Sequence, residues 1–138
     1  MANSDFFTLR GYNLQERGEI SHTMEDYLEM ICRNTRDGNY IRINRLAALL
    51  NVRPSSASKM AAKLRDSGMI NFQPYGVIEL TERGEEFGAF LLYRHEILHR
   101  LLCRINRTEN ELELVEKIEH HFDRETAKNI ESFLDNSG

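Results

Sequence analysis

The sequence predicts a mainly α-helical fold in which a winged helix-turn-helix module is followed by a module built of helices alone. Three observations predict it. Three helix-forming segments follow one another before Gly68, and two short apolar runs flank Pro74-Tyr75-Gly76, a pattern typical of a β-hairpin. The rest of the chain repeats apolar residues at helical spacing. We therefore expect an N-terminal arm of unassigned role over 1–21, the winged module over 22–80 and the helical module over 81–138.

End signals delimit the helices of the winged module. Thr23 is a suitable N-cap for the first helix, which should end near Asp37-Gly38. The segment RINRLAALLNV (42–52) predicts a second helix whose leucines face inward. Pro54 suits the first position of a third helix, and Gly68 should end it. The runs MINFQ and VIEL then predict the two strands of the wing.

Three further helices are expected in the helical module. Thr81 is positioned to cap a long, apolar-rich helix. Thr108 and Glu111 fit a capping box for the next helix, which should reach about His121. A last amphipathic helix covers roughly 124–134. These helices carry more apolar surface than the winged module needs, so we expect them to form the interface of a homodimer.

Basic residues gather in one part of the winged module, although the chain as a whole carries a net charge of −4. All 22 acidic residues lie outside 38–65, a stretch that holds six of the 18 basic residues. One basic face on an acidic protein is typical of phosphate contact, so double-stranded DNA is the expected partner; a solvated helix surface is the alternative. The expected contacts are to base edges from Ser55, Ser56, Ser58 and Lys59, and to phosphates from Arg53, Lys63, Arg65 and Tyr75. The serine hydroxyls could instead cap the helix.

Composition and the N-terminal sequence argue against several other classes of protein. Hydrophobic residues make up 41% and charged residues 29%, as in ordinary globular proteins. No apolar run approaches the ~20 residues that span a bilayer, and the N-terminus lacks the pattern of a secretory signal. We therefore expect a cytoplasmic protein with no membrane partner. Cys32 and Cys103 match no zinc or redox spacing and are expected to be reduced thiols.

Residue types that bind metals occur in three places. Asp26 and Glu29 lie three residues apart on the first helix and so share a face. His95 lies within the long helix. Glu116 precedes Glu119 and His120 by three and four residues on the next helix, so these three also share a face. Carboxylate oxygens mixed with imidazoles suit Mn²⁺ or Fe²⁺ better than Cu⁺ or a thiolate zinc site.

Charge favours a common site for these groups. Asp26, Glu29, Glu116 and Glu119 carry four negative charges, which two divalent cations would neutralise. A cation bound by both sets would clamp the first helix to the later helices. Each set also has a structural interpretation. Asp26 could merely serve the N-terminus of its helix, Glu29 could be solvated, and the later set could be the polar face of an exposed helix.

Two other functions compete with a metal-dependent regulator. The pentapeptide HEILH (95–99) matches the H-E-x-x-H signature of zinc peptidases, with His95 and His99 as ligands and Glu96 as general base. The chain is short for a protease, and this interpretation leaves Asp26, Glu29 and the basic helix unexplained. The other alternative is a winged-helix regulator that binds an organic ligand and needs no metal. We expect no catalytic residues and no small organic substrate.

Four segments carry a resemblance to a known family: MEDYLE (24–29), RPSSASKM (53–60), LYRHEIL (92–98) and VEKIEHH (115–121). In order and spacing they resemble the manganese-sensing branch of the diphtheria-toxin-repressor family, from about residue 22 to the end. The resemblance implies a Mn²⁺-dependent homodimer that represses manganese-uptake genes from a palindromic operator. An iron-responsive repressor of the same family is the alternative.

The resemblance also implies a site. The matching metal ligands are Asp26, Glu29, His95, Glu116, Glu119 and His120. They imply two Mn²⁺ ions per subunit, with Fe²⁺, Co²⁺, Cd²⁺ or Zn²⁺ as possible substitutes. Iron-sensing relatives have methionine and cysteine where this chain has Asp26 and Glu116, which favours manganese. His99 stands where the family has a glutamate, and the arm over 1–21 is longer than expected.

Overall fold

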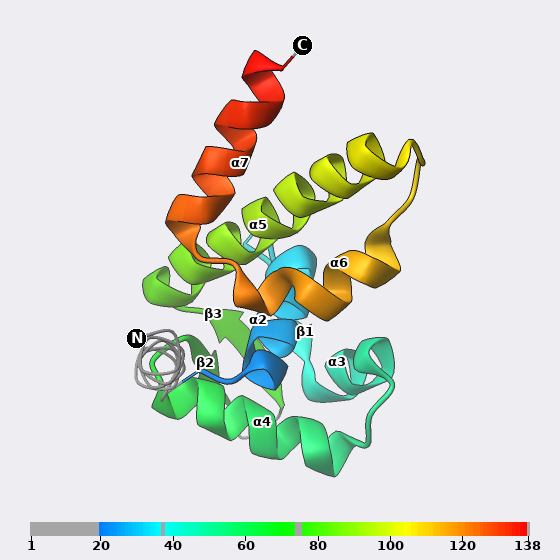
Figure 1. The fold of residues 1–138 in the computed structure, drawn as a ribbon. Coiled ribbons are helices and arrows are strands. Elements are labelled where there is room, and N and C mark those ends of the chain that lie inside the picture. The colour runs from blue at the N-terminus through cyan, green and yellow to red at the C-terminus, as the bar shows by residue number, and fades with distance from the viewer. Residues whose placement is uncertain (1–19, 37, 74–75, 138) are drawn as a thin grey trace, which may run out of the picture. The chain divides into compact units, whose positions relative to one another are not determined.

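The chain folds into helices and one small antiparallel sheet, shown in Figure 1 for the computed structural model, which confirms the predicted fold class. The structure describes residues 20–36, 38–73 and 76–137, so nearly all of the N-terminal arm lies outside the described residues. Contacts divide the chain into two units. Unit 1 ends at Thr81, and unit 2 follows it.

Unit 1 has the helices and strands of a winged helix-turn-helix. Its described elements are α2 (His22–Asn34), β1 (Ile41–Arg42), α3 (Ile43–Leu50), α4 (Pro54–Asp66), β2 (Ile70–Phe72) and β3 (Val77–Leu80). The sheet has the order β1-β3-β2 with antiparallel pairing, so β2 and β3 form the predicted hairpin. The sequence does not predict β1, because two residues are too few to show an alternating pattern.

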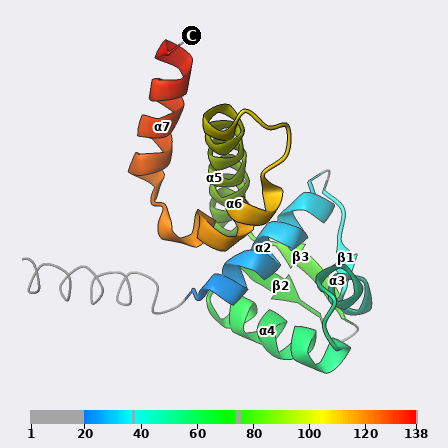
Figure 2. The same ribbon diagram turned by 45° about the vertical axis from the view of Figure 1, so that its right-hand side comes forward.

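The core of unit 1 lies between α2, α3, α4 and the sheet (Figure 2). Side chains from four elements are fully buried there, among them Leu28, Ile31, Leu46, Leu64 and Ile78. Each buried aliphatic side chain of this size contributes about 1.5–3 kcal/mol relative to an exposed one. Packing α4 against this core fixes which of its faces remains exposed.

The first helix begins two residues earlier than predicted. Ser21, not Thr23, is the N-cap: its backbone is extended, and its hydroxyl accepts a hydrogen bond from the Met24 amide at 3.2 Å. The first turn therefore contains Glu25 but not Asp26. The interpretation of Asp26 as a carboxylate that merely serves the helix dipole is weakened, because that effect decays within the first turn.

Unit 2 consists of α5 (Glu82–Asn106), α6 (Leu112–Ile118), the 3-10 turn η1 (Glu119–His121) and α7 (Arg124–Asn136). In both ribbon views α6 and α7 flank α5 on different sides. Arg104 joins α5 to α7 by donating to the Leu134 carbonyl at 3.0 Å. None of the helices in the described part of the chain combines the length and apolar character needed to cross a membrane.

The predicted capping box at Thr108 and Glu111 is wrong. Glu111 is itself the N-cap of α6, with no side-chain capping bond, and the Asn110 side chain accepts from the Leu112 amide at 2.9 Å instead. The helix also ends sooner than expected, because the last predicted turn is the 3-10 turn η1. α7 begins as predicted, with Asp123 accepting from the Thr126 amide at 2.8 Å.

Candidate functional site

The unit 2 part of the predicted metal site contains a buried imidazole–carboxylate pair. His95 lies in the middle of α5 and Glu119 opens η1, and His95 Nδ1 is 3.1 Å from Glu119 Oε1. Both side chains are buried, Glu119 to 1% exposure. Ligand atoms of Glu119 and the neighbouring His120 lie within 4.8 Å of each other. Unit 2 thus brings together three of the six predicted ligands.

Backbone geometry explains why Glu119 and His120 share one location. The tighter 3-10 turn succeeds α6 at Ile118, and the Phe122 amide donates to the Glu119 carbonyl at 3.2 Å. Glu116 lies one turn earlier on α6 and is exposed. The sequence predicted one continuous helical face for these residues, whereas the structure buries Glu119 and His120 and leaves Glu116 at the surface.

The two candidate ligands of unit 1 lie on α2 as predicted. Asp26 is exposed and Glu29 is half-buried. The Glu29 carboxylate accepts from Arg33 at 3.1 Å, one turn later on the same helix. A partly exposed pair of this kind is worth about 0.3–0.5 kcal/mol, so it is a weak competitor for a divalent cation.

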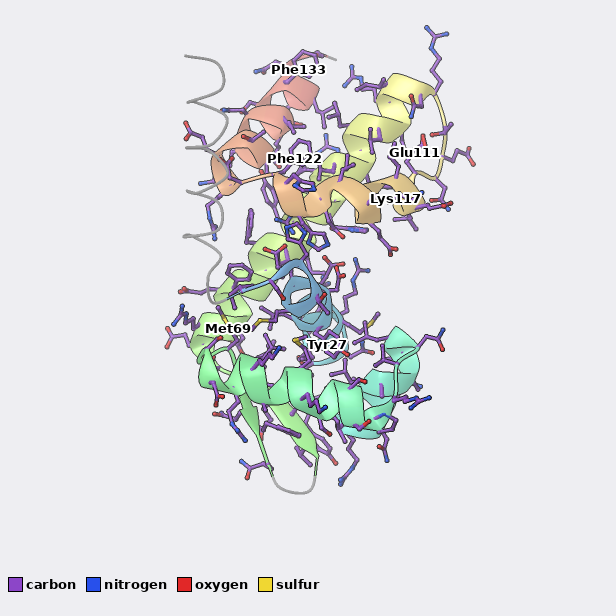
Figure 3. All side chains as sticks on the ribbon, turned by 60° about the horizontal axis from the view of Figure 1, so that its bottom comes forward. Tyr27, Met69, Glu111, Lys117, Phe122 and Phe133 are labelled. Carbon is purple, nitrogen blue, oxygen red and sulfur yellow. The ribbon has the colours of Figure 1, made fainter. Side chains whose placement is uncertain are left out.

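His99 has a local structural role that the sequence did not reveal. Its Nε2 accepts a hydrogen bond from the Glu111 amide at 3.1 Å, and Cys103 Sγ lies 3.4 Å from the same nitrogen. Glu111 lies where the chain turns from α5 into α6 (Figure 3). Within the described residues, no group of three potential ligands includes His99. His99 therefore holds the start of α6, and the zinc-peptidase interpretation lacks one of its two histidines.

The predicted DNA-reading helix is α4, and its two faces differ in character. Ala57, Ala61 and Leu64 have no exposed surface and pack into unit 1. The opposite side carries the predicted contact residues: Arg53, Ser55, Ser56, Lys59, Lys63 and Arg65 are exposed, and Ser58 is half-buried. Tyr75 lies outside the described residues.

Local geometry leaves this face available for a partner. Pro54 occupies the start of α4 and Arg53 is the N-cap, with no side-chain capping bond, so the serines do not cap the helix. Arg65 pairs with the adjacent Asp66, with Arg65 Nε 3.5 Å from Asp66 Oδ1. Arg53, Lys59 and Lys63 form no ion pair with any described residue. Unneutralised cations on one exposed face are suited to phosphate contact.

Comparison with known proteins gives consecutive matches to one family. "Iron dependent repressor, N-terminal DNA binding domain" matches residues 19–78, and "Iron dependent repressor, metal binding and dimerisation domain" matches 81–137. Over 100 residues the chain is 38% identical to the HTH-type transcriptional regulator MntR of Oceanobacillus iheyensis, covering 72% of this chain and 68% of the relative. It is 39% identical to the MntR of Geobacillus thermodenitrificans, covering 72% and 71%.

A solved structure has the same fold. The structure of the manganese regulator SloR superposes with a TM-score of 0.70 at 21% identity, over 81% of this chain and 53% of that one. This chain thus spans about half of the SloR chain. At this identity the likeness shows the fold alone.

Proposed function

Since the chain belongs to the iron dependent repressor family, we propose that it is a Mn²⁺-activated repressor that binds palindromic operator DNA and controls manganese-uptake genes. Membership establishes a metal-dependent, DNA-binding regulator that forms dimers, and not an enzyme. Manganese is supported by carboxylates at Asp26 and Glu116 and by relatives named as MntR and as a manganese regulator. A regulator of operators acts where the chromosome is, so we place it in the cytoplasm.

The buried pair of His95 and Glu119 is the observation that carries the metal proposal. A carboxylate with almost no exposed surface is costly unless it has a charged or hydrogen-bonding partner. His95 supplies a hydrogen bond when Nδ1 carries the proton, which leaves Nε2 with a lone pair for a cation. Oxygen and imidazole donors held together in a buried place fit Mn²⁺.

The proposed ligands are six: Asp26, Glu29, His95, Glu116, Glu119 and His120. Divalent cations, two per subunit, would supply the positive charge that four carboxylates require. Asp26 and Glu29 would bind from α2, and the other four from unit 2. In this scheme α2 is the element through which metal occupancy fixes the orientation of α4, because α2 packs directly on α4 within unit 1.

Unit 2 is the proposed dimerisation surface. Four of the five large hydrophobic side chains that are exposed among the described residues belong to it: Ile105, Leu112, Leu114 and Phe133. Ile105 is 64% exposed, and Phe133 on α7 (Figure 3) is 63% exposed. Apolar surface of this kind is typical of a protein interface. A homodimer would place two α4 helices against the two half-sites of a palindrome.

A DNA-binding titration tests the proposal. Operator affinity should be high with Mn²⁺ and should fall when EDTA removes the metal. Glu116→Ala should require more Mn²⁺ for the same occupancy, because one proposed ligand is missing. Glu113→Ala is the matched control: Glu113 is exposed one turn earlier on α6, where it pairs with Lys117 at 3.5 Å. Operator binding that is insensitive to EDTA would refute the proposal and favour a metal-independent regulator.

Iron is the alternative activator, favoured by the name of the matching family. The same titration with Fe²⁺ under anaerobic conditions separates the two. A manganese sensor should reach full operator occupancy with Mn²⁺ alone. Occupancy that requires Fe²⁺ at equal free metal concentration would assign the protein to iron regulation.

A further inference from the structure

We propose that Arg94 is a positioning residue that holds Glu119 and His120 in a metal-binding arrangement; this inference rests on the proposed function. Arg94 lies on α5 directly before His95 and is 1% exposed. Arginine is almost never fully buried unless its charge has partners. The groups that contact this buried guanidinium therefore indicate its structural role.

Arg94 donates a hydrogen bond from NH1 to the Phe122 carbonyl at 3.2 Å, across 28 positions of sequence. Phe122 is the residue directly after η1 (Figure 3), and its own amide donates to the Glu119 carbonyl at 3.2 Å. Phe122 thus connects the two elements: its carbonyl accepts from the Arg94 guanidinium on α5, and its amide donates to the backbone of Glu119, a proposed ligand. Arg94 acts on the C-terminal end of η1.

His95 acts on the other end of the same turn, since its ring is 3.1 Å from the Glu119 carboxylate. Two consecutive residues of α5 therefore contact η1 at its first side chain and at the carbonyl that follows it. A 3-10 turn of three residues has few internal hydrogen bonds. External contacts at both ends are what keep such a turn in one conformation.

The guanidinium is itself fixed by an aromatic ring. Its Cζ lies 5.3 Å from the centroid of the Phe90 ring, one turn earlier on α5. Arg124, at the start of α7, lies 4.7 Å from the same ring. A planar guanidinium can stack on a ring and donate in its own plane at the same time, which a lysine ammonium does not do. This requirement explains an arginine at position 94.

The consequence for metal binding is preorganisation. If η1 is already ordered without metal, binding does not have to order it, and less affinity is lost to that step. Substitution of a residue that orients metal ligands typically reduces metal affinity by about 10–100-fold. We expect a loss in this range when the guanidinium is removed.

The test compares Arg94→Met, Arg94→Lys and Arg100→Met in the full chain. Mn²⁺ affinity is measured by the loss of the free-ion electron paramagnetic resonance signal, and hydrogen exchange of residues 119–122 is measured without metal. Arg94→Met should bind Mn²⁺ about 10–100-fold more weakly and exchange faster at these amides. Arg94→Lys should restore part of both. Arg100→Met, which removes a surface pair with Asp135, should change neither.

Three results would overturn the inference. One is a folded Arg94→Met that binds Mn²⁺ like the wild type. The second is a wild-type protein whose Phe122 amide is unprotected without metal, a measurement that stands even if Arg94→Met fails to fold. The third is a folded Arg94→Lys that binds Mn²⁺ as tightly as the wild type, because a lysine ammonium cannot stack on Phe90 and donate to the Phe122 carbonyl as the guanidinium does. Failure of the wild type to bind Mn²⁺ would instead refute the proposed function.

Discussion

Replacing Lys63 with alanine should weaken the salt dependence of operator binding by a calculable amount. Lys63 is exposed on α4 and has no ion pair among the described residues, so its charge is available for a phosphate. Each phosphate contact changes the slope of log K against log salt by about 0.9. A dimer loses two contacts, so the slope should become shallower by about 1.8.

This difference is large enough to measure directly. Raising salt from about 50 to about 200 mM should cost the variant roughly tenfold less affinity than it costs the wild type. Fluorescence anisotropy with labelled operator at saturating Mn²⁺ gives the slope. Lys117→Ala is the control, because Lys117 on α6 (Figure 3) is exposed and already pairs with Glu113. A Lys63→Ala slope equal to that of the wild type would refute phosphate contact by this residue.

Three other substitutions test the structure of the two units. Leu64→Ala should cost about 2–5 kcal/mol of unfolding free energy in a urea titration, because Leu64 has no exposed surface; a cost below 1 kcal/mol would contradict its burial. His99→Ala should lower thermal stability by leaving the Glu111 amide without its acceptor, yet keep Mn²⁺ affinity, whereas loss of Mn²⁺ binding would contradict a role confined to the start of α6. Burial and the hydrogen bond to Glu131 raise the pKa of Tyr93 to about 12. Because that pKa lies above the unfolded value of about 10, stability should fall as pH rises from 10 towards 12, and less so in Tyr93→Phe.

The fold was predictable where one sequence pattern determined one element. α4 combines a proline at its start, small apolar residues on one face and cations on the other, and the structure retains all three features. The resemblance to the repressor family is confirmed by matches on both sides of residue 80. These patterns are local in sequence, so they can be recognised without knowledge of tertiary contacts.

Helix ends were less predictable because several polar residues compete for each cap. Ser21 and Thr23 are both good N-cap residues, and only the backbone conformation decides between them. Thr108 and Glu111 have capping-box spacing, but the Glu111 amide donates its hydrogen bond to the ring of His99, which lies on α5. A contact across 12 positions leaves no trace in the spacing of neighbouring residues.

The part of the site that sequence spacing could not supply is the buried charge around η1. Glu116, Glu119 and His120 share a helical face by spacing, yet the change to a 3-10 turn separates an exposed carboxylate from two buried groups. Nothing in the spacing of residues around Arg94 distinguishes it from an exposed arginine on an amphipathic helix. Only its burial, the Phe90 ring that it stacks on and the Phe122 carbonyl that it donates to reveal a buried cation beside a proposed metal ligand.

The distribution of proposed ligands has a thermodynamic consequence for the regulator. Two of the proposed ligands lie on α2 of unit 1 and four lie in unit 2. A cation that uses both sets would therefore bind only to conformations in which both sets can reach it. If operator DNA selects the same arrangements, metal and DNA stabilise each other, typically by about 1–3 kcal/mol, and the coupling is reciprocal. Arg94 would not contribute to that coupling, because the turn that it holds is ordered with or without metal. Its loss should therefore weaken Mn²⁺ binding by a similar factor whether or not DNA is present, whereas loss of Asp26 should reduce the coupling itself.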